Sequence, residues 1–254
     1  MIFFFTATGN SLYTAKQLDD EYFSIAQEIH KTNNKYTADK IGIVCPIFGH
    51  EMPQPVKDFI KNARFDTDYL YLILTYGKRH GGAAELADIE AKKYGKTFDY
   101  INVIEMVDNF LPAFDMNEET ALDKKVDEHI SKIKTDISQK KKMISEVTQA
   151  DRDIHQMYLD RMAAMPPDAF KKIYRVTDDC IGCSICNKVC PMNCFEIKNQ
   201  RAEQNSQNCV MCMACIHACP KKAIQMNMPE KNPDARYRNE NIGIMEIINA
   251  NCQI

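Results

Sequence analysis

The chain has 254 residues, a formal net charge of -3, and 11 cysteines but only 9 glycines. About 4% cysteine is too little for a disulfide scaffold, and 45% apolar with 26% charged residues exclude a disordered chain, collagen and a coiled coil. The small net charge gives no electrostatic reason to expect nucleic acid, and the length favours two domains.

The first apolar run, residues 2–5, is short and has no basic segment before it. It is too short for a signal peptide or a transmembrane helix. We therefore expect a cytoplasmic protein with no membrane partner. In that compartment thiols stay reduced, and clustered cysteines bind metal more often than each other.

Residues 1–106 alternate between strand and helix patterns. Strands are expected at 2–5, 24–29, 41–45, 69–75 and 98–106, and helices at 10–21, 55–63 and 82–94. Five strands separated by helices predict an α/β fold with a five-stranded, doubly wound parallel sheet.

A long helix is expected from Asn117, as its cap, to about Ser145. Its apolar stripe comprises Leu122, Val126, Ile130, Ile133 and Ile137. The first domain then covers residues 1–149. Residues 150–173 are expected to link it to a second domain, 174–254, and to set the distance between the two.

The turn after the first strand is a candidate phosphate site. It reads Thr6-Ala7-Thr8-Gly9-Asn10-Ser11, without the lysine of a nucleotide P-loop or the glycines of a dinucleotide fold. Its hydroxyls and the free amides of a helix start can surround a phosphate, although plain helix capping remains an alternative.

Two further loops are expected at the same sheet edge, because ligands of open α/β sheets bind at the carboxyl ends of the strands where the strand order reverses. Five of the nine glycines fall in the three loops: Gly9, Gly49, Gly77, Gly81 and Gly82. The candidate residues of the second and third loops are Pro46, Ile47, Phe48, Gly49, Thr75, Tyr76, Gly77, Gly81 and Gly82.

Three basic side chains in these loops are weak catalytic candidates: His50, Arg79 and His80. They could donate a proton or bind an anionic substrate, since histidine titrates near neutral pH. The alternative is that they are ordinary solvated loop side chains.

Eight cysteines form two identical runs with the spacing C-x2-C-x2-C-x3-C-P, offset by 29 residues. The runs are Cys180, Cys183, Cys186, Cys190 and Cys209, Cys212, Cys215, Cys219. This is the bacterial ferredoxin pattern for 4Fe–4S clusters, in which the fourth cysteine of each run ligates the other run's cluster.

One cluster would take Cys180, Cys183, Cys186 and Cys219, and the other Cys209, Cys212, Cys215 and Cys190. The alternative, structural zinc, usually pairs two C-x2-C knuckles and fits two four-cysteine runs poorly. The sequence therefore predicts an α+β domain with two clusters.

The other three cysteines are not expected to bind metal. Cys194 aligns with Ala223 through the 29-residue offset, which indicates a packed core thiol. Cys45 and Cys252 have no ligand partner nearby in sequence and are expected to be structural or free thiols.

These motifs together resemble a known family. The segment 4–11 resembles the flavodoxin phosphate loop, and its combination with two ferredoxin runs resembles the flavodoxin–ferredoxin fusion proteins (EFR-type ferrodoxins) of anaerobic bacteria. The turns at 46–49 and 76–77 and the stretch 107–109 also match that family.

The resemblance implies a flavodoxin-like domain that binds FMN and a domain with two 4Fe–4S clusters. The segment 6–11 would hold the FMN phosphate, and 46–49 and 75–82 would flank the isoalloxazine ring. The chain has no Trp, so the tryptophan that often shields the flavin in flavodoxins is missing. Phe48 or Tyr76 would stack instead, or one flavin face stays open.

The functional hypothesis is electron transfer between the two clusters and FMN, as a redox carrier for partner enzymes. The alternative is a flavin-dependent reductase of a small acceptor, such as a quinone, fed by the clusters. A redox sensor is a weaker third reading, because no output module is recognisable. The expected partners are redox proteins or a small electron acceptor, and a homodimer is left open.

Overall fold

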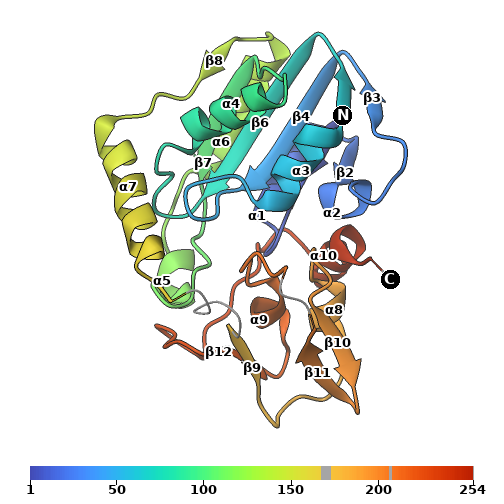
Figure 1. Ribbon diagram of the computed structural model, residues 1–254, viewed down its shortest axis with the longest axis vertical. Helices are drawn as coiled ribbons and strands as arrows, with labels where there is room; N and C mark the ends of the chain where they lie inside the picture. The colour runs from blue at the N-terminus through green and yellow to red at the C-terminus, as the bar shows by residue number, and fades with distance from the viewer. Residues whose placement is uncertain (167–172, 206–207, 254) are drawn as a thin grey trace.

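A six-stranded sheet forms the centre of the first region (Figure 1). The computed structural model describes residues 1–166, 173–205 and 208–253. The sheet order is β2-β1-β4-β6-β7-β8 and every neighbouring pair is parallel. The strands are β1 (Ile2–Phe4), β2 (Tyr22–Ser24), β4 (Lys40–Pro46), β6 (Tyr69–Tyr76), β7 (Tyr100–Glu105) and β8 (Met143–Ile144).

The predicted doubly wound parallel sheet is confirmed, with one strand more than the five expected. The first five strands follow the flavodoxin-like order 2-1-3-4-5, which reverses direction between β1 and β4. The sixth strand, β8, has two residues and pairs Met143 with Tyr100. So short a strand carries no periodic signal in the sequence.

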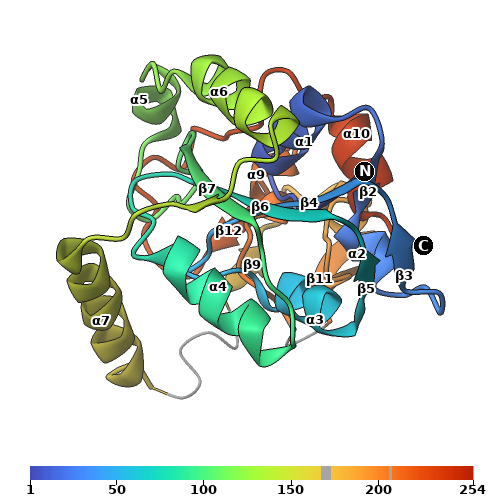
Figure 2. The same ribbon diagram turned by 90° about the horizontal axis from the view of Figure 1, so that it is seen from above.

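Helices cover both faces of the sheet (Figure 2). α1 (Asn10–Leu18) and α6 (Val126–Ser138) pack on the face that receives Ile2 and Phe4. α3 (Gln54–Asn62) and α4 (Ala83–Lys93) pack on the face that receives Phe3 and Phe5. Successive strand residues point to opposite faces, so a run that is apolar throughout fits a strand buried on both sides.

Two expected elements differ in the structure. The strand expected at 24–29 ends at Ser24, and Ile25–Glu28 form the short helix α2. A separate parallel pair, β3 (Lys35–Thr37) and β5 (Arg64–Asp66), lies outside the main sheet.

The helix expected from Asn117 to about Ser145 is broken in two. The first part, α5 (Met116–Thr120), is capped by Asp115, whose carboxylate accepts the backbone N–H of Asn117 at 2.9 Å. The second part is α6, and Lys125 before it has a positive φ of 51°. Leu122 lies in the break and is 50% exposed, so the buried stripe begins only in α6.

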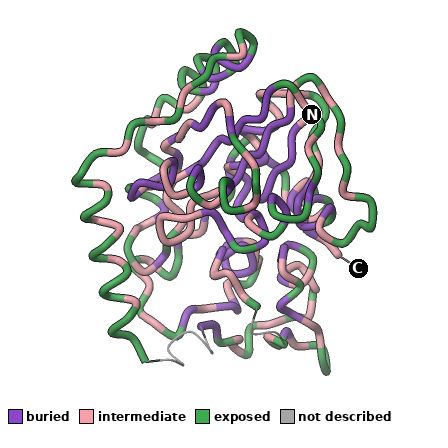
Figure 3. The backbone as a smooth tube through the Cα atoms, turned by 45° about the horizontal axis from the view of Figure 1, so that its top comes forward, coloured by how far each residue is buried: buried purple, intermediate pink, exposed green. Residues whose placement is uncertain are grey.

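Much of the segment expected to link the two regions is the helix α7 (Gln149–Ala163), which begins with a capping box at Thr148. None of its residues is buried, and Figure 3 shows it as an exposed helix at the edge of the molecule. Residues 167–172 of the expected linker lie outside the described residues. Among the described helices, none has the length and apolar character needed to span a membrane.

The second region is a small α+β unit built from two hairpin-like pairs. β9 (Tyr174–Val176) pairs antiparallel with β12 (Ile224–Met226), and β10 (Phe195–Lys198) with β11 (Arg201–Gln204). Short helices α8 (Ile185–Lys188) and α9 (Ala214–Ala218) complete the repeat, and α10 (Ile244–Asn251) follows it. Because β9 precedes the first cysteine run and β12 follows the second, the two halves are interleaved.

This second region packs on the carboxyl edge of the sheet (Figure 1). Val189 and Cys212 share one hydrophobic cluster with Ala7 and Leu12, which lie just after β1. Met192 also packs against the cluster on the other face of the sheet. The chain is therefore an α/β protein with a central parallel sheet and a C-terminal ferredoxin-like region seated where a flavodoxin-like sheet binds its ligand.

Candidate functional site

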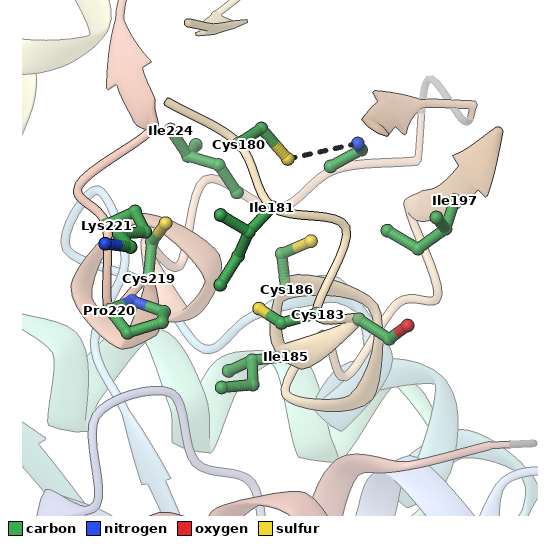
Figure 4. A pocket seen from close by; sticks show the side chains of 12 residues that line it. Cys180, Ile181, Cys183, Ile185, Cys186, Ile197, Cys219, Pro220, Lys221 and Ile224 are labelled. Atoms are coloured by element: carbon green, nitrogen blue, oxygen red, sulfur yellow. Dashed lines mark hydrogen bonds between the residues drawn. The ribbon is translucent and has the colours of Figure 1, made fainter. Parts of the chain in front are cut away.

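Four cysteines of the ferredoxin-like region surround one cavity (Figure 4). Cys180 and Cys183 approach it from the segment before α8, Cys186 from α8 itself, and Cys219 from the end of α9. The rest of the lining is mainly apolar and includes Ile181, Ile185, Ile197, Pro220 and Ile224. We call the four cysteines Cys180, Cys183, Cys186 and Cys219 the outer thiols, because Cys183 is exposed.

The two cysteine runs have the same backbone as well as the same spacing. Residues with positive φ recur at the 29-residue offset: Gly182 and Met211, Ser184 and Met213, Asn193 and Lys222. The left-handed residues 182 and 184 turn the chain tightly between the first three cysteines. A non-glycine residue at positive φ is uncommon, so its repetition at matched positions indicates a common local structure for both runs.

The other four cysteines form the inner thiols, Cys190, Cys209, Cys212 and Cys215. Three of them are at most 7% exposed. Burial raises the pKa of Cys215, and the thiols of Cys212, Cys190, Cys209 and the outer Cys186 raise it further. Hydrogen bonds and nearby positive charge both favour the ionised form of a buried thiol, and iron in a cluster supplies positive charge.

Backbone amides point at thiols of both groups. The N–H of Cys194 donates to Cys190 Sγ at 3.2 Å, and the N–H of Ala223, its repeat equivalent, donates to Cys219 Sγ at 3.2 Å. The N–H of Ala202 donates to Cys180 Sγ at 3.4 Å, drawn as the dashed line in Figure 4. Hydrogen bonds to thiolate sulfur are among the features that set cluster potentials.

One more donor faces the inner thiols. Tyr174 is 7% exposed, and its hydroxyl has no hydrogen-bond partner within the described part of the chain. Burial raises its pKa, and all four inner thiols contribute to that rise. A buried neutral hydroxyl with no acceptor fits a site where a cluster sulfur completes the hydrogen bond.

The remaining cysteines lie apart from this pattern. Cys194 is fully buried and its thiol donates to the carbonyl of Met192 at 3.5 Å, as expected for a packed core residue, although it also lies against Cys190 and Cys209. Cys45 is fully buried inside the sheet. In the residues that the structure describes, no three His, Cys, Asp or Glu side chains converge on a single metal ion. The outer thiols line one cavity, and thiol donors of this kind suit a 4Fe–4S cluster.

The candidate phosphate loop lies at the start of α1, as expected, but it is buried. Thr6 and Ser11 are each 1% exposed and Thr8 is 4% exposed. The Thr8 hydroxyl accepts from Asn109 Nδ2 at 3.1 Å, and the Ser11 and Thr75 hydroxyls are 2.9 Å apart. The Thr6 hydroxyl has no partner among the described residues.

The other two loops are closely packed around their glycines. A Cβ on Gly49 would lie 2.3 Å from the Tyr158 hydroxyl of α7, and one on Gly81 would lie 2.2 Å from the His50 ring. A Cβ on Gly77 would meet the carboxyl group of Asp108 at 2.2 Å. These glycines therefore allow side chains of this protein to approach the loop backbone.

The three weak catalytic candidates do not converge on one open site. The His50 ring packs 5.7 Å from the His155 ring and 5.2 Å from the Tyr158 ring. Burial lowers the pKa of His50, and His155, Arg79 and His80 lower it further. His80 lies 3.6 Å from Asp151, and Arg79 is exposed. Both histidines therefore have a neighbour in α7, and the His80 ring also packs 5.3 Å from the Tyr76 ring.

Polar side chains join the ferredoxin-like region to the loop edge. The buried His217 of α9 hydrogen-bonds the Asn109 carbonyl through Nε2 at 2.8 Å and accepts the N–H of Tyr237 at Nδ1 at 3.0 Å. Burial lowers its pKa to about 4, so the ring is neutral, with its proton on Nε2. Asn251 is fully buried and donates from Nδ2 to the carbonyls of Thr6 and Val189, both at 3.0 Å.

Sequence reasoning missed these bridging residues. Asn251 belongs to a tail with no motif, and its partner Thr6 is 245 positions away. His217 lies inside the second cysteine run, between Cys215 and Cys219, and its partner Asn109 is 108 positions away. Nothing in the spacing of the sequence indicates either contact. Asn251 in the last turn of an apolar helix was the one available signal, because a polar residue there needs a buried partner.

Residues 172–220 match the family model of the 4Fe–4S dicluster domain. All eight cysteines of the inner and outer thiols lie within this match. It identifies this part of the chain as an iron–sulfur domain, whose chemistry is electron transfer.

Comparison with solved structures finds a putative flavoprotein from Bacteroides uniformis ATCC 8492. It is 15% identical, the match covers 41% of this chain and 88% of that chain, and the TM-score is 0.32. A likeness at this level carries no argument about function. Comparison with curated proteins finds no match.

Proposed function

We propose that this protein is an electron carrier that passes electrons between two 4Fe–4S clusters and FMN. The outer thiols Cys180, Cys183, Cys186 and Cys219 hold one cluster, and the inner thiols hold the other. This assignment rests on the interleaved repeat: β9 pairs with β12, α8 and α9 lie side by side, and Cys219 of the second run lines the cavity of the first run's cysteines.

The observation that carries the proposal is that residues of the inner-thiol region pack in the same hydrophobic cluster as the sheet edge. Cys212 and Val189, the neighbour of Cys190, share a hydrophobic cluster with Ala7 in the candidate phosphate loop. A 4Fe–4S cluster held by the inner thiols would lie next to the edge where a flavodoxin-like sheet binds its ligand. Electron transfer between the two groups then needs no large movement of either region.

The chain's residues also give the two clusters different surroundings. Three of the inner thiols are buried and Cys209 is half-buried, whereas the outer thiols include the exposed Cys183 beside Ile181, which is 59% exposed. We propose that a redox partner exchanges electrons at the outer thiols, and that the inner thiols pass them toward the sheet.

The donor set of the first loop fits a phosphate. Thr6, Thr8 and Ser11 supply hydroxyls, the start of α1 supplies backbone amides, and the Thr6 hydroxyl is buried without a partner among the described residues. We propose that 6–11 hold the FMN phosphate and that 46–49 and 75–82 flank the ring. When bound there, FMN exchanges one or two electrons, which lets one-electron clusters serve two-electron reactions.

A carrier fits the loop residues better than a reductase does. Acid–base groups for a substrate should converge on an accessible flavin face. His50 and His80 instead pack against α7, and Arg79 extends into solvent. The proposed partners are therefore redox proteins.

The test is the cofactor content of protein purified without oxygen. We expect about eight iron and eight sulfide per chain, and one FMN bound per chain on titration. About four iron, or zinc in place of iron, contradicts the two-cluster assignment. Eight iron with no flavin binding at any concentration leaves the clusters intact and refutes the FMN part alone.

A further inference from the structure

The candidate phosphate loop is covered by the protein's own C-terminal segment, residues 237–242. The backbone N–H of Asn239 donates to the Thr8 carbonyl at 2.8 Å. The Tyr237 hydroxyl and Asn239 Nδ2 both donate to Asn10 Oδ1, at 2.6 and 3.2 Å. The groups that would face a phosphate at this loop are therefore next to a segment more than 200 residues away in sequence.

The cover also fills the space beside Gly9. Gly9 has a φ of +103°, and a Cβ built on it would lie 3.1 Å from the Cβ atoms of both Asn239 and Ile242. Both side chains are buried, at 6% and 1% exposure. A phosphate needs room at this same turn, since the amides that bind it are those at the start of the helix.

The hydrogen-bonding groups of the loop thus suit a phosphate, but the loop has no room for one in this structure. The hydroxyl of Thr6 is buried without a partner among the described residues, as in a site that expects an acceptor, yet the loop is almost closed to solvent. One arrangement satisfies both observations: the loop binds phosphate after the cover has moved.

We propose that residues 237–242 form a lid that must leave the loop before FMN binds, so that the lid and the FMN phosphate compete for Asn10 and Gly9. This inference rests on the FMN site proposed above. A protein whose lid is closed most of the time binds FMN with an apparent affinity reduced by the fraction that is open.

The lid is an irregular segment in which Tyr237, Asn239 and Ile242 are buried and the residues between them face solvent. It contains no helix or strand, and Arg238, Glu240 and Asn241 are exposed. Its two ends are held elsewhere: the Tyr237 N–H binds His217, and α10 is fixed by Asn251 and by the 2.5 Å contact of Lys16 with Glu246. The lid can therefore open while both anchors stay in place.

The experiment compares FMN binding to holo-protein with intact clusters and no flavin, by the quenching of FMN fluorescence on mixing. The double variant Tyr237→Phe/Asn239→Ala removes both side-chain hydrogen bonds to Asn10 and leaves the loop residues unchanged. Arg238→Ala is the matched control, because it changes an exposed side chain of the same segment. Iron content and circular dichroism verify that each variant is folded and loaded.

For the wild type we expect a binding rate that reaches a plateau as FMN increases, since lid opening becomes limiting. In the double variant the apparent affinity should rise by about 10- to 30-fold, as expected for two lost hydrogen bonds, and the plateau rate should rise with it. Arg238→Ala should match the wild type.

Equal rates and affinities for wild type and double variant, with no plateau, overturn the lid and leave the FMN site standing. No binding to any variant, with eight iron still present, overturns both the FMN site and the lid while the cluster assignment stands.

Discussion

Replacing Asn251 by alanine should loosen the contact between the two regions. Its side-chain amide donates to both regions, to the Thr6 carbonyl after β1 and to the Val189 carbonyl beside Cys190. The side chain is fully buried. Asn251→Ala therefore strands two buried acceptors at the junction of the sheet and the inner thiols.

The magnitude follows from these contacts. A buried acceptor left without its donor costs about 1–3 kcal/mol, so two cost about 2–6 kcal/mol. The substitution also removes Asn251 Oδ1, a buried atom without a partner among the described residues, which returns part of that cost. We expect a net loss of about 2 kcal/mol, or about a 30-fold increase in the opening equilibrium of α10.

Hydrogen exchange of the α10 amides measures this opening locally. The reporters are the N–H groups of Ile247 and Cys252, which bond within the helix to Gly243 and Ile248. These amides should exchange about 30-fold faster in Asn251→Ala than in wild type. Asn249→Ala is the control, because the Asn249 side chain is exposed on the same helix, and its amides should exchange at the wild-type rate. Less than a threefold change in Asn251→Ala refutes the reasoning, because the amide would then contribute little to holding α10.

Three further predictions concern the clusters and the loop edge. Cys219→Ser should lower iron from about eight to about four per chain, while Cys194→Ser should keep both clusters; loss of a cluster in Cys194→Ser contradicts its role as a packed thiol. Tyr174→Phe should lower the reduction potential of the inner cluster by about 20–60 mV, the equivalent of one hydrogen bond to sulfur; an unchanged potential in redox titration argues against that bond. Burial lowers the folded-state pKa of His50, so below about pH 6.5 the unfolded chain binds more protons and the free energy of unfolding falls as pH falls. The His50→Gln variant should therefore lose less stability than wild type between about pH 7 and pH 5. Parallel losses in urea titrations of the two proteins would contradict the burial of that ring.

The sheet and the cysteine repeat were predictable because each leaves a local signal. Apolar runs separated by helices predicted the parallel order, and the 29-residue offset predicted an internal repeat that recurs in matched backbone angles. Elements without such a signal were missed. β8 is two residues long, and the break before α6 depends on the positive φ at Lys125 and on an exposed Leu122.

The position of the candidate loop was predictable, but its environment was not. The loop at 6–11 lies at the sheet edge as expected, and its burial under 237–242 depends on contacts across the whole chain. The same holds for His217 and Asn251, whose partners are set by how the two regions pack. Spacing within a motif carries no information about a segment that meets the motif only after folding.

The most direct test of the central claim is the rate of electron transfer after a laser flash that reduces the clusters of holo-protein loaded with FMN. If electrons pass within one chain between the clusters and the flavin, flavin reduction should follow cluster oxidation with a rate independent of protein concentration. A rate that rises in proportion to protein concentration, or a flavin that stays oxidised while the clusters remain reduced, would contradict the account.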